Sequence, residues 1–255
     1  MKIDSLKINK KNTYNEKFYE DIDNSSYQSA KIYLDYLWQF IKPMSVLDVG
    51  CGRGAWLKAC EELGSKDITG LDGSWLDQTK MISRKIKFKS IDLNGIFSVE
   101  KKVDLTMSLE VAEHIDRRNS RQFIECLTTT SDVIMFSAAY EYQGGTDHIN
   151  ENKHSYWAKI FDNLDYTVYD IFRPHFWSDE RVGFWFRQNT FLYVKKGSDQ
   201  VKKFNELGIT EIKNIEFMDC IHPNLYEHKC GQELSFKIYA KNIFPSLFRA
   251  IKKRL

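Results

Sequence analysis

The chain has 255 residues, a formal net charge of +2 and 42% hydrophobic residues. This length and composition can build one large domain, or one domain with an appendage, and they exclude a globally disordered chain. The nearly balanced charge argues against a general nucleic-acid binder.

Localisation signals are absent from the sequence as given. No window approaches the roughly 18 consecutive apolar residues of a membrane-spanning helix, and residues 1–18 lack the apolar segment of a signal peptide. Five cysteines at irregular spacing are typical of reduced thiols rather than of a disulfide framework. We therefore expect a cytoplasmic protein.

The chain begins with a helical pattern, which is followed by a pattern of alternating strands and helices. Between Tyr14 and Phe40 apolar residues recur at helical spacing, and Pro43 closes the run. Short apolar runs then alternate with helical segments, which indicates a doubly wound, mostly parallel sheet. The predicted strands are Val46–Val49, Ile68–Leu71, Phe88–Ile91, Val103–Leu109, Val133–Ser137, Thr167–Phe172 and Thr190–Val194, and the predicted later helices are Ala55–Leu63, Trp75–Ser83, Ser120–Thr129 and Ser155–Asn163.

Three parts follow from this pattern. We predict an N-terminal helical cap at residues 1–42, an α/β domain at residues 43–196, and a C-terminal subdomain at residues 197–255, where the alternation stops. Sheets of this kind bind ligands at the carboxyl ends of their strands.

A glycine-rich loop follows the first strand in the stretch SVLDVGCGRGAW. Gly50, Gly52 and Gly54 permit a tight turn and close approach of the backbone to a ligand. The dinucleotide fingerprint G-x-G-x-x-G is not completed, because residue 55 is alanine. Asp48 also suits an ammonium group better than a pyrophosphate. A dinucleotide-dependent oxidoreductase is therefore an alternative, but a disfavoured one.

Acidic residues end the next two strands. Asp72 can accept hydrogen bonds from both hydroxyls of a ribose, and Asp92 can accept one from an adenine amino group. Each aspartate is also an ordinary turn or cap residue. Three acids at three successive strand ends, Asp48 included, favour a shared ligand.

The segments VLDVGCGRG, GLD, SIDL and LEVAEHI, in this order within residues 45–196, resemble class I S-adenosylmethionine-dependent methyltransferases. The resemblance implies a Rossmann-like α/β fold with a seven-strand, mostly parallel sheet, and it implies S-adenosyl-L-methionine as cofactor with S-adenosyl-L-homocysteine as product. A non-catalytic subunit with this fold is a third alternative, against which the complete set of glycines and acids weighs. The residues that the resemblance assigns to the cofactor are Asp48, Gly50, Cys51, Gly52, Asp72, Gly73, Asp92, Leu93, Ser108, Leu109 and Glu110.

The end of the fourth strand carries the candidate catalytic residues. In the family fold this strand ends beside the transferred methyl group, so Glu113 and His114 should face the reaction centre. His114 is the first candidate for a general base, because imidazole titrates near neutral pH. Glu110, Glu113, His114 and His148 can instead hold a divalent metal, as in methyltransferases for RNA 2′-hydroxyls or quinone precursors that resemble this arrangement. A purely structural role for Glu113 and His114 also stays open.

Two segments are candidates for binding the acceptor. A polar loop after the fifth strand contains Tyr140 and Gln143 with a glycine hinge at Gly144 and Gly145. A later stretch contains arginines among aromatic residues, which suits a sugar or phosphate but is equally typical of an aromatic subcore. Its candidate residues are Arg173, Trp177, Arg181 and Arg187.

The pattern GGTDHINE…SYW…RP…W…RQNT resembles methyltransferases of bacterial capsule and surface-glycan pathways. It implies O-methylation of a small sugar, or of a phosphate-bearing acceptor such as a phosphoramidate oxygen. An anionic phosphate oxygen would need no general base. A nucleic-acid acceptor is not expected, apart from the RNA 2′-hydroxyl alternative, and the oligomeric state is not predicted.

The C-terminal part raises two further hypotheses. Cys220, His222, His228 and Cys230 can bind zinc if they lie on a hairpin that turns at Pro223 and Asn224, although ordinary hairpin residues are favoured. Residues 243–255 form a basic amphipathic pattern that can rest on an anionic membrane surface. Packing against the domain or a second subunit is the favoured use of that helix.

Overall fold

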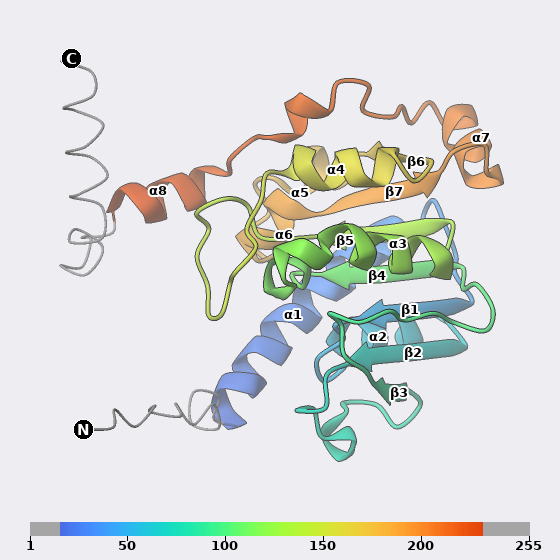
Figure 1. Cartoon of the computed structure of the whole chain (residues 1–255), viewed down its shortest axis with the longest axis vertical. Coiled ribbons are helices and arrows are strands. Elements are labelled where there is room, and N and C mark those ends of the chain that lie inside the picture. The colour runs from blue at the N-terminus through green and yellow to red at the C-terminus, as the bar shows by residue number, and fades with distance from the viewer. Residues whose placement is uncertain (1–15, 232–255) are drawn as a thin grey trace. The chain divides into compact units, whose positions relative to one another are not determined.

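The computed structural model describes the backbone of residues 16–231 and the side chains of residues 25–227. Seven strands form one sheet in the order β3-β2-β1-β4-β5-β7-β6 (Figure 1). All neighbouring strands are parallel except β7, which runs antiparallel to both β5 and β6. The α/β fold and all seven predicted strands are therefore confirmed. Their bounds are β1 Ser45–Val49, β2 Asp67–Asp72, β3 Lys87–Ser90, β4 Leu105–Leu109, β5 Val133–Ser137, β6 Tyr166–Tyr169 and β7 Phe191–Lys195.

Helices cover both faces of the sheet and create two apolar cores. Helices α1 (Glu16–Leu37) and α2 (Ala55–Glu62) lie on one face, and α3 (Ser120–Thr130) and α4 (His154–Asp162) lie on the other (Figure 1). Successive residues of a strand point to opposite faces. Accordingly Val46 of β1 joins the core beneath α1 and α2, whereas Leu47 joins the core beneath α3 and α4.

The predicted helix Trp75–Ser83 is wrong. Only one 3₁₀ turn forms there, Gln78–Lys80, and the side chain of Asp77 caps it by accepting a hydrogen bond from the Thr79 backbone N–H. Most side chains of this segment are half-buried or exposed, and Trp75 keeps 74% of its surface exposed. Only Leu76 and Met81 pack against the core, and so little apolar contact does not stabilise a short helix.

Three helices between β6 and Cys220 were not among the predicted helices. Helices α5 (Arg173–Phe176) and α6 (Phe184–Asn189) lie between β6 and β7 and are too short to show a helical period. Helix α7 (Asp199–Glu206) follows β7, and its Phe204 is fully buried against Tyr169. The first compact unit extends to Cys220, beyond the predicted boundary at residue 196. The three-part division otherwise stays a prediction.

The second unit comprises Ile221–Leu255. Helix α8 (Pro223–Gly231) begins where we predicted a hairpin turn, so that hairpin is wrong, and the His222 carbonyl accepts hydrogen bonds from the first turn of the helix. The side chains of residues 228 and 230, and the whole of the predicted amphipathic segment 243–255, lie outside the described residues. None of the helices within residues 16–231 combines the length and apolarity needed to cross a membrane.

Candidate functional site

The glycine loop turns directly after β1 and leaves no room for a side chain at its first position. Gly50 has φ +84°, and a Cβ added there would lie 2.2 Å from Cγ2 of Val111. The backbone N–H groups of Gly50 and Cys51 both donate to the carbonyl oxygen of Leu71, which draws the loop to the end of β2. Only glycine fits this turn without displacing Val111.

The Asp72 carboxylate is fixed in place by this loop. It accepts hydrogen bonds from the backbone N–H of Gly52 at 2.7 Å and from that of Gly73 at 2.6 Å. Burial raises the pKa of Asp72, and the two hydrogen bonds oppose that rise. Each carboxylate oxygen keeps a further lone pair, so the group can still accept hydrogen bonds from ligand hydroxyls.

Asp48 lies at the same strand ends and is 3% exposed. Its burial, together with the nearby charge of Asp72, raises the pKa of Asp48 to about 8. A buried carboxyl of this kind gains from a cationic ligand, because a cation offsets the cost of its desolvation. Asp48, Asp72 and the glycine loop therefore fit a ligand that carries both an ammonium group and a ribose.

Asp48→Asn is expected to flatten the dependence of thermal stability on pH in the cofactor-free protein. The folded-state pKa of Asp48 exceeds its unfolded value, so the folded state binds more protons between about pH 4 and pH 8 and loses stability as pH rises through that window. The variant lacks this titration and should melt several degrees above the native protein at about pH 8. Melting temperatures measured across this range check it, with the exposed Asp67→Asn as control. If the melting temperatures of the native protein and of Asp48→Asn changed with pH in the same way, the raised pKa of Asp48 would be refuted.

The other predicted cofactor residues surround the same strand ends. Asp92 is exposed, and its side chain accepts a hydrogen bond from the Asn94 N–H, so it also caps a turn. The indole of Trp75 lies against Gly73, where a Cβ would approach that ring to 2.0 Å. Ser108 is fully buried, and its hydroxyl has no hydrogen-bond partner among the described residues. Cys51, Leu93 and Leu109 are buried.

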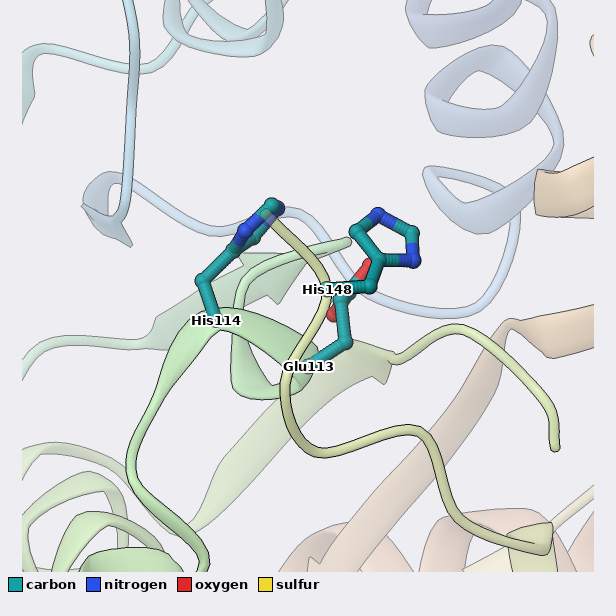
Figure 2. Close-up of side chains that lie close together, drawn as sticks. All are labelled: Glu113, His114 and His148. Carbon is teal, nitrogen blue, oxygen red and sulfur yellow. The ribbon is translucent and has the colours of Figure 1, made fainter. Parts of the chain in front are cut away.

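The candidate catalytic residues come together from two loops (Figure 2). Glu113 and His114 lie on a 3₁₀ turn after β4, and His148 lies on the loop after β5. One ligand atom from each of the three lies within 4.8 Å of the others. The Glu113 carbonyl accepts hydrogen bonds from the backbone of residues 149 and 150, which ties the two loops together. Gly145 makes room for the imidazole of His148, because a Cβ there would lie 2.3 Å from Nε2.

The cluster combines one buried acid with two imidazoles, and His148 also has an acidic partner outside it, because its Nδ1 lies 2.9 Å from Oε1 of Glu151. Glu113 is fully buried, and neither carboxylate oxygen makes a well-formed hydrogen bond to the described residues. Burial first, and then the charge of Glu110, raises the pKa of Glu113 well above its usual range. Burial and the neighbouring His148 lower the pKa of His114. A buried carboxyl beside two imidazoles can bind a cation or accept the proton of an acceptor.

Glu110 does not join that cluster. It has φ +56°, and its carboxylate accepts hydrogen bonds from Gln143 at 3.2 Å and from Asn189 at 3.1 Å. Among the proposed metal ligands, Glu110 therefore lies apart from the other three. Asn189 was not among the predicted site residues, although the polar run Arg187–Asn189 directly before an apolar strand is a signal of the same kind as Glu110 after one.

The acceptor-side arginines have partners inside the protein. Arg173 donates to Asp170 and to the Met218 carbonyl, and Arg181 donates to Asp179. Arg187 is buried, and its Nη1 donates to the carbonyl oxygen of Trp177. Tyr140 is buried as well, and Gln143 contacts Glu110. Roles in binding an acceptor stay a prediction for all of these residues.

Comparison with known proteins gives a curated relative and a wider group of similar folds. The ubiquinone biosynthesis O-methyltransferase of Dictyostelium discoideum is 29% identical over 104 residues, which cover 34% of this chain and 32% of that protein. The match therefore spans about a third of that relative's length.

Solved structures of methyltransferases share the fold. Magnesium protoporphyrin IX methyltransferase from Synechocystis PCC 6803, solved with bound SAH, is 17% identical with a TM-score of 0.50, and the match covers 72% of this chain and 89% of that one. The small RNA methyltransferase HEN1 is 18% identical with a TM-score of 0.50, and the match covers 66% of this chain but only 25% of that one.

A family model described as "Methyltransferase domain" matches residues 26–181, which include the glycine loop, the acids at the strand ends and the Glu113, His114 and His148 cluster. This match rules out the dinucleotide-dependent oxidoreductase. The chain belongs to the methyltransferase-domain family, with a class I α/β fold and S-adenosylmethionine as its cofactor.

Proposed function

We propose that this methyltransferase transfers the methyl group of S-adenosylmethionine to a hydroxyl oxygen of a small sugar-containing acceptor in the biosynthesis of a bacterial capsule or surface glycan. We further propose that a divalent metal ion, held by Glu113, His114 and His148, assists the reaction. The observation that carries the proposal is the convergence of one buried carboxyl and two imidazoles beside the end of β4.

Three features of this chain are proposed to bind the cofactor, namely Asp48, Asp72 and the glycine loop. Asp48 faces the ammonium group of the cofactor, and Asp72 accepts hydrogen bonds from the ribose hydroxyls. The glycine loop lets the cofactor approach the backbone between them. When bound, S-adenosylmethionine supplies an electrophilic methyl group, so the protein mainly has to align the acceptor oxygen and remove its proton.

The Glu113, His114 and His148 cluster at the end of β4 helps to remove the proton of the acceptor hydroxyl. A hydroxyl is a poor nucleophile until it is polarised or deprotonated. A divalent ion bound to the hydroxyl oxygen would polarise it and so make its proton easier to remove. His114 stays neutral at physiological pH because its pKa is lowered, which suits either a metal ligand or a base.

The arginines favour a hydroxyl acceptor over an anionic phosphate or phosphoramidate. A phosphate site would need guanidinium groups aimed at the ligand. Arg173 and Arg181 instead pair with Asp170 and Asp179 at 2.7 Å and 2.6 Å. The glycan acceptor is supported by the sequence pattern that begins with GGTDHINE at residues 144–151, which resembles methyltransferases of capsule and surface-glycan pathways.

The 2′-hydroxyl of an RNA ribose is a second candidate acceptor. It is also a sugar hydroxyl, and the Glu113, His114 and His148 cluster would serve it by the same chemistry. The near-neutral charge of the chain favours the smaller acceptor.

Methyl-labelled S-adenosylmethionine tests both candidates. The full chain is freed of metal with chelator and assayed with added Mg²⁺, Mn²⁺ or Co²⁺ against a panel of sugar nucleotides and a short RNA duplex. We expect metal-dependent label in a sugar ether. Label in RNA alone would replace the first candidate with the second. Equal transfer with and without metal would remove the metal from the proposal.

A further inference from the structure

The side chain of Asn189 lies between the carboxylate of Glu110 and the buried ring of His154. Its Nδ2 donates to Glu110 at 3.1 Å and to Oε1 of Gln143 at 2.9 Å. Its Oδ1 accepts from Nε2 of Gln188 at 3.0 Å and lies 3.0 Å from Nε2 of His154. All the polar atoms of Asn189 are therefore in use. Turning the amide over would place its oxygen against a carboxylate, which also only accepts.

His154 holds the amide from the other side. Its Nδ1 lies 2.9 Å from the carbonyl oxygen of Met218, which also accepts a hydrogen bond from Nη1 of Arg173 at 2.7 Å. Burial lowers the pKa of His154 to about 4, so the ring carries one proton near neutral pH. Both ring nitrogens therefore face acceptor oxygens, and the neutral ring has one proton to donate. In the tautomer protonated on Nε2, His154 donates to Oδ1 of Asn189.

Glu110 needs such support because of its backbone. A residue other than glycine with φ +56° is in the left-handed region, which persists when surrounding contacts hold it. The Glu110 N–H donates to the hydroxyl of Ser137 at 3.0 Å, which fixes its backbone. The carboxylate is fixed separately, by the amides of Gln143 and Asn189.

We infer that Asn189 and His154 are positioning residues, which hold the Glu110 carboxylate in the orientation in which it contributes to binding S-adenosylmethionine. This inference rests on the proposed cofactor role of Glu110. His154 acts only through Asn189, since its two ring nitrogens face Asn189 and Met218. The junction of α6 and β7 thereby supports a residue at the end of β4, on the far side of β5 in the sheet.

A double-mutant cycle on S-adenosylhomocysteine affinity, measured by calorimetry, tests this without an acceptor. Asn189→Ala is made in the native protein and in the Glu110→Ala variant. We expect it to weaken binding about tenfold in the native protein but less than about twofold where Glu110 is already absent, because residues that act through one contact are not additive. His154→Phe, which keeps an aromatic ring between Tyr140 and Phe191, repeats the cycle without opening a large cavity.

Thr130→Val is the matched control. It removes a buried hydrogen bond, 2.7 Å from Thr106 on β4, and should lower the melting temperature without changing the affinity. Equal losses of affinity in both backgrounds would show that Asn189 and His154 stabilise the fold and do not position Glu110. If Glu110→Ala binds S-adenosylhomocysteine like the native protein, the cofactor role of Glu110 fails and this inference fails with it. The acceptor assay described above would still report on the proposed methyl transfer.

Discussion

Replacing His148 with alanine is expected to lower methyl transfer by roughly 10²-fold or more, with little change in the affinity for S-adenosylmethionine. The residue supplies one of three ligand atoms that lie within 4.8 Å of one another. It comes from a different loop than the other two, so its loss opens the cluster without touching the glycine loop. Initial rates with labelled cofactor and the acceptor found in the panel assay check the expectation.

Two comparisons separate a metal site from a general base. If a metal is bound, His114→Gln should be as damaging as His148→Ala, chelator should abolish the native activity, and a divalent ion should restore it. If His114 is a general base, the His114→Gln defect should shrink at high pH, where the acceptor loses its proton unaided. His175→Ala is the control histidine, since its ring stacks on Tyr36 away from the cluster. Native rates for both the His114 and His148 variants would exclude every catalytic reading of the cluster.

Asp72→Ala is expected to weaken binding of S-adenosylmethionine about 100-fold or more, because two ribose hydroxyls lose a charged acceptor and such bonds are worth ~1.5–3 kcal/mol each. The N–H groups of Gly52 and Gly73 hold the carboxylate in place before the ligand arrives. Asp72→Asn should also bind weakly, because its amide would set a donor against one of those two N–H groups. Calorimetry with S-adenosylmethionine measures both variants.

The control for Asp72 lies on the same strand. Asp67, at the other end of β2, pairs with Lys87 at the surface, where both side chains are more than half exposed. Such a pair is worth ~0–1 kcal/mol, so Asp67→Ala should leave cofactor affinity unchanged. If Asp72→Ala matched Asp67→Ala in affinity, Asp72 could not be the ribose acceptor.

The strands and the cofactor loop could be predicted from local pattern, because their signals are short in sequence. Apart from β3, which is mostly exposed, the strands contain short apolar runs, as expected where a sheet is buried on both faces. The glycines of the loop follow β1 directly, so their role shows within a few residues. The segment Trp75–Ser83 failed for the opposite reason: it contains good helix formers, but only Leu76 and Met81 pack against the core, which is too little apolar contact to hold a helix.

All three members of the candidate catalytic cluster were predicted from the sequence as site residues, and the structure brings them together. Glu113 and His114 are adjacent, and a strand end beside the methyl made them candidates. His148 lies 34 residues further along, and only the parallel pairing of β4 with β5 brings its loop to the same edge. The separation of Glu110 from that cluster could not be predicted, because it depends on the left-handed backbone at Glu110 and on the amides of Gln143 and Asn189.

By itself, then, the sequence determined the α/β fold, the methyltransferase family and the acids at the strand ends, because these depend on periodicity and on residues close together in the chain. The tertiary structure decided which polar groups meet. Asn189 hydrogen-bonds Glu110, from which it is separated by 79 positions in the sequence, and His154 lies against Asn189, 35 positions away. The tertiary structure also gave Arg173 and Arg181 carboxylate partners of their own. Such pairings follow from the order and direction of strands in the sheet, which place distant loops at one edge, and no local pattern records them.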